Sequence, residues 1–169
     1  MSKAFTKDDD GGGELLVVPR APLPVGLPNY VTPRGLVALQ AEELELVRER
    51  AAVDAVDRVA LRQALGHRLA ELQARIAGAT VVDPGLQPHD EVRFGATVRV
   101  RSADGEERAY EIVGVDEADA EHGRIAFSSP LARALLGKRQ GDSLELCMPR
   151  ATEELEIVHI AYAARSDQP

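Results

Sequence analysis

The sequence predicts an α+β protein, in which an antiparallel helical hairpin precedes a domain with an antiparallel sheet and one short helix. Two observations predict this fold class. Apolar residues recur every three to four positions as far as Gly78, which is typical of packed helices, and beyond Pro84 they alternate as in strands. We therefore divide the chain into a tail (1–30), a coiled-coil hairpin (31–80) and a sheet domain (81–165).

The first 30 residues have the composition of a tail. Three aspartates (8–10) and three glycines (11–13) are followed by prolines at positions 19, 22, 24 and 28. Such a stretch has little apolar surface to bury, and proline resists helix formation. We expect residues 1–30 to be extended or disordered.

The helical block begins at Thr32, which can cap a helix whose first residue is Pro33. Two apolar series at helical spacing follow, and Gly78 is a natural helix end. A single helix over 33–78 would be about 69 Å long, too long to stand alone in a small protein. We therefore expect two antiparallel helices whose apolar faces bury one another. The two series are Leu36, Leu39, Leu44, Val47 and Ala51, then Leu61, Leu65, Leu69, Leu72 and Ile76.

The turn between the two helices has two possible positions. The symmetric solution, which we prefer, places it near residues 53–57, with Asp54 or Asp57 capping the second helix. The competing solution turns at Gly66 and His67 and leaves a shorter return helix.

Asp54, Asp57 and His67 are therefore the candidate tip residues of the hairpin. A carboxylate pair on a protruding tip can share a divalent ion at a partner's active site. The alternative is that one aspartate caps a helix and the other is solvated.

Beyond the hairpin, short alternating segments predict strands that are separated by turn residues. A hairpin turn is expected at 102–105. A short helix is expected to begin at Ser129 and Pro130 and to end before Gly137. The expected strands cover residues 92–100, 110–115, 125–127, 143–148 and 155–162.

Composition and charge exclude several classes of function. The 169 residues carry a net charge of −8, and aromatic residues make up only 4%. An extended DNA-binding groove needs clustered Lys and Arg, and a single-strand platform needs stacked aromatic side chains. The acidic excess lies in residues 79–169, with ten basic and seventeen acidic groups, whereas residues 33–78 have seven of each. An acidic chain of this kind is expected to contact another protein.

Motifs for catalysis or metal binding are absent from the sequence. It contains no nucleophile motif, P-loop or dinucleotide fingerprint, and its four histidines lack the short spacing of metal ligands. We therefore expect no catalytic residue, no metal and no cofactor. The sequence also lacks a signal-peptide core and a run of 18 apolar residues, so a cytoplasmic protein is expected.

Several segments together resemble the GreA/GreB transcription elongation factors. The run from Ile125 to Asp142 is similar to the C-terminal signature of that family, and residues 29–35 resemble the start of its first coiled-coil helix. The remaining similar segments are Phe94-Gly-Ala96, Ile112-Val-Gly-Val-Asp-Glu117, Pro149 and the GreB-type N-terminus Met1-Ser-Lys-Ala-Phe5.

This resemblance implies a fold, a partner and a way of binding. Members of the family place an antiparallel coiled coil in the secondary channel of bacterial RNA polymerase. Their FKBP-like C-terminal domain docks at the channel rim, on a coiled coil of the largest subunit. Such a factor is not itself an enzyme, and DNA and RNA are reached only through the transcription complex. We expect a monomer that regulates elongation or initiation.

The hairpin departs from the family pattern. Cleavage-stimulating members carry an acidic tip, Gly-Asp-(Leu/Arg)-Ser-Glu-Asn, and residues 33–83 contain no such motif. In the stretch 65–70, His67 stands where the family has Asp. The segment is also shorter than usual by about ten residues per helix, or about 15 Å of reach. We therefore expect no strong stimulation of transcript cleavage.

Two alternative functions remain at this point. One is an active cleavage factor that uses Asp54 and Asp57 as a relocated tip. The other is a prolyl isomerase, which the FKBP-like fold suggests, although fold does not imply function. Its pocket would have to be built from Phe94, Tyr110, Phe127 and Tyr162.

The segment that best matches the family is its docking loop. Ser129-Pro130-Leu131-Ala132 matches the family's Ser-Pro-x-Ala, and Ser128 precedes it where the family often has an acidic residue. The predicted partner-binding residues are Ser128, Ser129, Pro130, Leu131 and Ala132. The same residues can also serve only to start a helix and supply core side chains.

Overall fold

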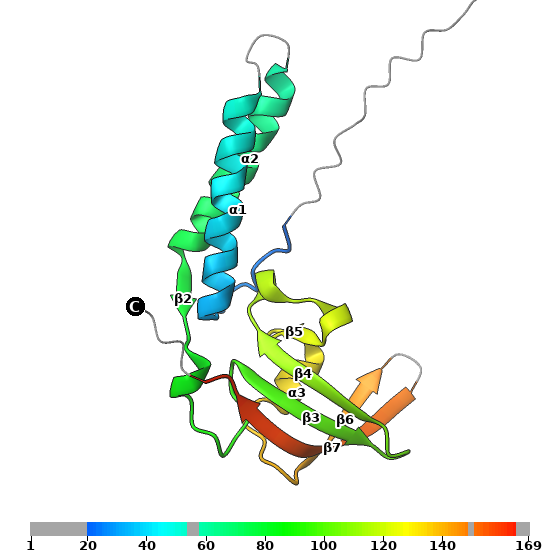
Figure 1. The fold of residues 1–169 in the computed structure, drawn as a ribbon. Helices are drawn as coiled ribbons and strands as arrows, with labels where there is room; N and C mark the ends of the chain where they lie inside the picture. The colour runs from blue at the N-terminus through cyan, green and yellow to red at the C-terminus, as the bar shows by residue number, and fades with distance from the viewer. Residues whose placement is uncertain (1–19, 54–57, 149–150, 165–169) are drawn as a thin grey trace, which may run out of the picture.

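The computed structural model describes residues 20–53, 58–148 and 151–164, and two helices dominate its first half. Helix α1 (Pro33–Ala52) and helix α2 (Val59–Ala77) form an antiparallel hairpin that projects from a sheet domain (Figure 1). The hairpin is closed at its base by a parallel pair of short strands, β1 (Asn29–Val31) and β2 (Ala79–Val81). Part of the predicted tail, Asn29 and Tyr30, is thus the first strand.

The predicted ends of the helical block are confirmed. The Thr32 side chain accepts a hydrogen bond from the Gly35 amide at 3.0 Å, and Pro33 occupies the first position of α1. The Gly78 amide caps α2 by donating to the Ala74 carbonyl. The N-cap of α2 is Arg58, which makes no side-chain capping bond, so the predicted aspartate cap is wrong.

The symmetric hairpin is the correct solution for the turn. The first helix ends at Ala52 and the second begins at Val59, so the chain reverses between them. Gly66 and His67 lie inside α2, and the competing turn is not formed. His67 is therefore not a tip residue, because the helical pattern of leucines continues through it from Leu61 to Ile76.

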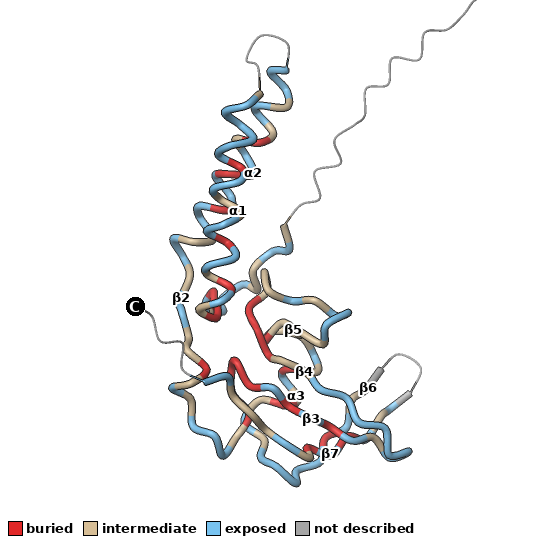
Figure 2. Tube along the Cα trace, viewed as in Figure 1, coloured by how far each residue is buried: buried red, intermediate tan, exposed pale blue. Residues whose placement is uncertain are grey.

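The hairpin core follows the predicted series in α2 but not in α1. Leu44 and Val47 are 59% and 45% exposed, although the sequence pattern placed them in the core. Leu46, which lies two helical turns after Leu39 on the same face of α1, takes their place. Figure 2 shows the buried residues of both helices along their shared face. Buried in this cluster are Val31, Leu39, Leu46, Leu65, Leu69 and Leu72.

The sheet domain is built on five strands in the order β5-β4-β3-β7-β6. Strand β3 pairs antiparallel with β4 and β7, and β6 pairs antiparallel with β7. The strands are β3 (Ala96–Ser102), β4 (Glu107–Val113), β5 (Arg124–Ala126), β6 (Ser143–Met148) and β7 (Ala151–Tyr162).

The α+β fold class is confirmed, but the sheet is mixed, since β5 runs parallel to β4. The connection between them crosses the end of the sheet through two short 3-10 helices, η2 (Val115–Glu117) and η3 (Ala120–His122), so that the chain re-enters in the same direction. A third, η1 (Pro84–Leu86), lies between the hairpin and the sheet.

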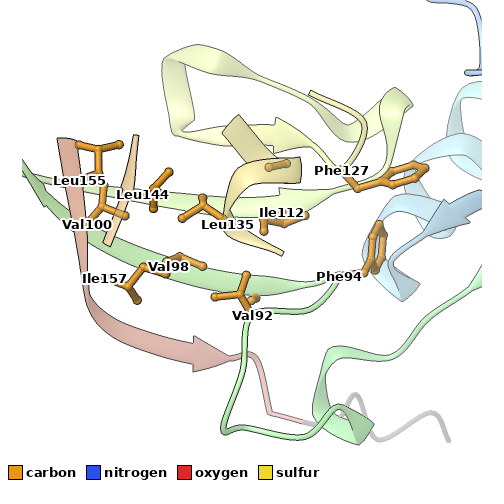
Figure 3. Close-up of a cluster of buried hydrophobic side chains, with 12 residues drawn as sticks. Val92, Phe94, Val98, Val100, Ile112, Phe127, Leu135, Leu144, Leu155 and Ile157 are labelled. Carbon is orange, nitrogen blue, oxygen red and sulfur yellow. The ribbon is translucent and has the colours of Figure 1, made fainter. Parts of the chain in front are cut away.

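One face of the sheet is covered by helix α3 (Pro130–Leu135), and the core lies between them. Figure 3 shows Leu135 of α3 above Val98 and beside Ile112, and the rings of Phe94 and Phe127 at the end of the cluster nearest the N-terminal segment. Alternation along β3 puts Val98 and Val100 into this core. No helix in the described ranges is long and apolar enough to span a membrane.

Candidate docking loop and the junction at the hairpin base

The segment Ser128–Ala132 connects β5 to α3, and local hydrogen bonds fix its backbone. The Ser129 amide donates to the Ala126 carbonyl at 2.9 Å, and the Arg133 amide donates to the Ser129 carbonyl at 3.0 Å. The Ser129 hydroxyl caps the helix by accepting from the Ala132 amide at 3.2 Å. This turn therefore presents the loop in one conformation, as the capping sequence predicts.

The five predicted partner-binding residues differ in what they offer a partner. Pro130 is exposed, and Ser128, Ser129 and Leu131 are half-buried. Ala132 is fully buried in the core and cannot be touched from outside, so its role is structural. The candidate docking surface is therefore Ser128–Leu131, centred on Pro130.

The candidate tip aspartates, Asp54 and Asp57, lie outside the described residues. Within the described parts of the chain, no group of three His, Cys, Asp or Glu side chains is arranged to hold a metal ion.

The aromatic residues required for an isomerase pocket do not line one pocket. Phe94 and Phe127 pack against Tyr30, with ring centroids 5.6 Å from it, beside a shallow apolar hollow. Tyr110 and Tyr162 are not in that lining. The Tyr162 hydroxyl instead donates to the Glu91 carbonyl at 2.6 Å, and burial raises the pKa of Tyr162.

Two segments that the family resemblance identified separately meet at the hairpin base. Glu117 of η2 accepts hydrogen bonds from the Thr32 amide at 2.9 Å, from the Thr32 hydroxyl, and from the Gly114 amide at 3.2 Å. A Cβ on Gly35 would collide with the Glu117 carboxylate, and one on Gly114 would lie 2.5 Å from the Tyr30 carbonyl oxygen. Glycine at position 35 therefore allows α1 to approach η2 closely, and glycine at position 114 allows β1 to do so.

The neighbouring residue, Asp116, forms a second contact at the same junction. Its side chain is 2% exposed and lies between two guanidinium groups, Arg75 of α2 and Arg20, each at 3.0 Å. Arg20 also contacts Glu42 of α1 at 2.6 Å. The sequence does not predict this network, because charges that lie 41 and 96 residues apart in the chain each look like solvated charges.

The pKa of Asp119, which lies beside this junction, can be measured to test the described contacts. Its carboxylate accepts from Arg124 and contacts the His122 ring, both at 2.7 Å, and these two groups lower its pKa from 3.8 to about 2. Because the folded pKa is the lower one, its contribution to stability is present above about pH 4 and is lost as the pH falls toward 2. We expect the Asp119 carboxyl carbon to titrate near pH 2 by NMR, and Arg124→Gln to raise that midpoint. A midpoint near 4 in the unmodified chain would contradict the geometry.

Comparisons with known proteins agree with these features. Residues 87–162 match the family model "Transcription elongation factor, GreA/GreB, C-term". Transcription elongation factor GreA of Azorhizobium caulinodans is 47% identical over 97 residues, which cover 57% of this chain and 62% of that protein. The chain thus aligns with less than two thirds of this relative's length.

A longer match is found with GreB. Transcription elongation factor GreB of Neisseria meningitidis is 36% identical over 153 positions, which take in 79% of this chain and 94% of that protein. Among solved structures, the GreA/GreB factor of Nitrosomonas europaea is 26% identical, with a TM-score of 0.42 and coverage of 79% of this chain and 98% of that one. The similarity to nearly the whole GreB relative shows that this chain belongs to the GreA/GreB family of transcription elongation factors.

Proposed function

We propose that this chain binds bacterial RNA polymerase at the secondary channel and regulates elongation or initiation without strongly stimulating transcript cleavage. In this proposal the sheet domain is FKBP-like and docks on the rim of the channel, and the hairpin points into the channel. DNA and RNA are met only through the transcription complex.

The observation that carries the proposal is the presentation of Pro130. It is the exposed residue at the start of α3. The hydrogen bonds of Ser129 with Ala126 before it and with Ala132 and Arg133 after it fix the backbone of this turn. A rigid, exposed loop beside a packed core needs little ordering when a partner binds, so little binding free energy is lost. The hairpin projects from the same domain, so one docking event also places the hairpin (Figure 1).

The absence of strong cleavage stimulation is supported by the sequence of the hairpin. The acidic tip motif of the family is absent from residues 33–83. A carboxylate must come within about 2–2.5 Å of magnesium to coordinate it, so a hairpin that stops short contributes nothing to the metal.

Docking through Pro130 is tested by the change Pro130→Glu. The first position of a helix tolerates glutamate, whose charge suits the helix N-terminus, so the fold is expected to be kept. A buried unpaired charge at the interface is expected to weaken binding to core polymerase at least about tenfold, or about 1.4 kcal/mol. Ala103→Glu, in the turn between β3 and β4, adds the same charge elsewhere on the domain and is the control. Equal binding by wild type and Pro130→Glu, or no binding by either, would refute the proposed docking.

The alternative function, cleavage stimulation by Asp54 and Asp57, has its own assay. We expect little shortening of RNA in stalled complexes with magnesium, and no further change when both aspartates are replaced by Asn. Strong shortening that disappears in the double variant would establish the alternative instead.

A further inference from the structure

Residues 20–29 run along the junction between the hairpin and the sheet domain, and they are held at both ends. We call this segment the strap. At its far end the Asn29 side chain, 6% exposed, donates to the Arg75 carbonyl at 2.9 Å. At its near end the Arg75 guanidinium contacts the Ala21 carbonyl, and Arg20 makes the two ion pairs described above. Asn29 and Ala21, near the two ends of the strap, therefore both contact Arg75 in the last turn of α2.

Arg20 connects the hairpin to the sheet domain, in addition to the contacts of Thr32 with Glu117, Arg75 with Asp116 and Arg34 with Glu111. Its Nη2 contacts the Glu42 carboxylate of α1 at 2.6 Å, and its Nη1 contacts Asp116 of η2 at 3.0 Å. Glu42 lies nine residues beyond Pro33, about 14 Å along the helix axis. The contact between Glu117 and Thr32 lies at the start of α1. If the hairpin tilts about that contact, the distance between Arg20 and Glu42 changes more than the distance between Glu117 and Thr32.

Arg20 lies between two acidic side chains, Glu42 and Asp116, that line one crevice. Glu42 and Asp116 line the two sides of this crevice between α1 and η2, and Arg34 and Arg124 also line it. Without the guanidinium, two carboxylates face each other across that crevice, and Asp116 keeps only Arg75. Loss of Arg20 therefore removes the attraction that draws Glu42 of α1 toward Asp116 of η2, and this favours opening of the crevice.

We propose that Arg20 is a positioning residue, which holds the helical hairpin at a fixed angle to the sheet domain. Its consequence for transcription rests on the proposed function, because a hairpin that is free to tilt enters a partner's channel less often. The fixed angle itself is a property of the free protein. A planar guanidinium reaches two carboxylates with separate nitrogens, whereas lysine offers a single point charge. Arg20→Lys is therefore expected to hold the hairpin only in part.

The experiment measures the angle as a distance between two spin labels on the full chain. One label is placed at Gln63→Cys on α2 and the other at Thr97→Cys on β3, with the native cysteine replaced by Cys147→Ser; both labelled positions are exposed. Gln63 lies 14 residues from the end of α2, about 21 Å along the helix, so a tilt of about 10° moves it by about 4 Å. We expect Arg20→Gln and Asp116→Asn to broaden or shift the distance distribution by about this amount, and Arg20→Lys by less.

Arg101→Gln is the matched control. Arg101 also lies between two carboxylates, Glu107 at 2.8 Å and Glu156 at 3.8 Å, but all three belong to the sheet. It is expected to leave the distance unchanged, and the melting temperature of Arg20→Gln is expected to stay near that of wild type. A distribution in Arg20→Gln with the same mean distance and the same width as in wild type would overturn the inference. Since polymerase is not present, this outcome is independent of whether Pro130 docks.

Discussion

Gly114→Ala is expected to destabilise the protein by about 2–4 kcal/mol, because the added methyl group has no space. Its Cβ would lie 2.5 Å from the Tyr30 carbonyl oxygen and 2.8 Å from a Glu117 oxygen. The first of these atoms is backbone and cannot rotate away, so β1 and η2 must move apart. That movement also breaks the bonds from Thr32 to Glu117. The free energy of unfolding in urea measures the effect.

Gly78→Ala is the matched control for this change. Gly78 has a φ of −88°, which alanine adopts without strain, and its nearest contact would be Ala74 O at 3.4 Å. We expect a change within about 1 kcal/mol there. Equal stability of Gly114→Ala and Gly78→Ala would show that η2 does not pack against β1 as closely as described.

Leu72→Ala is expected to cost about 3 kcal/mol and to loosen the hairpin specifically. Leu72 is 0% exposed, and it packs among Leu39, Leu69 and Val31 near the hairpin base. Removing its side chain leaves a cavity that two thin helices cannot fill from neighbouring layers. Amide hydrogen exchange should rise throughout α1 and α2 and change little in β3 and β7, which have their own core.

Leu44→Ala makes the same chemical change at a position that is 59% exposed. It is expected to cost less than about 1 kcal/mol. A large loss at Leu44 with a small loss at Leu72 would mean that the two helices face each other in another rotation.

The comparison of Leu44 with Leu72 also shows how far sequence patterns determine a hairpin. In α2 the leucines at positions 65, 69 and 72 define a single apolar face, and the predicted buried face is correct. In α1, Leu44 and Leu46 are two residues apart and cannot lie on the same face of the helix. The local spacing of apolar residues is therefore compatible with two different buried faces. Packing against α2 determines which of the two faces is buried, and this contact cannot be read from the sequence of α1 alone.

The same distinction holds for the rest of the fold. The turn at Ser129 and Pro130 was predictable, because capping acts within four residues. The pairing of β1 with β2 was not, since three-residue strands carry no period and their partners lie 50 residues apart. The junction at Asp116 combines groups 41 and 96 residues away, and each alone resembles any solvated charge. The parallel pairing of β5 was missed for the same reason.

The pairing of β1 with β2 has a consequence for how such a protein can change over evolution. Val31 lies opposite Val81, so the chain leaves for the hairpin and returns from it at one fixed place. Whole helical turns added or removed between Ala52 and Val59 change the length of the projection while its root is unaffected. The length and the tip of the hairpin can therefore vary while the sheet domain keeps its sequence and shape.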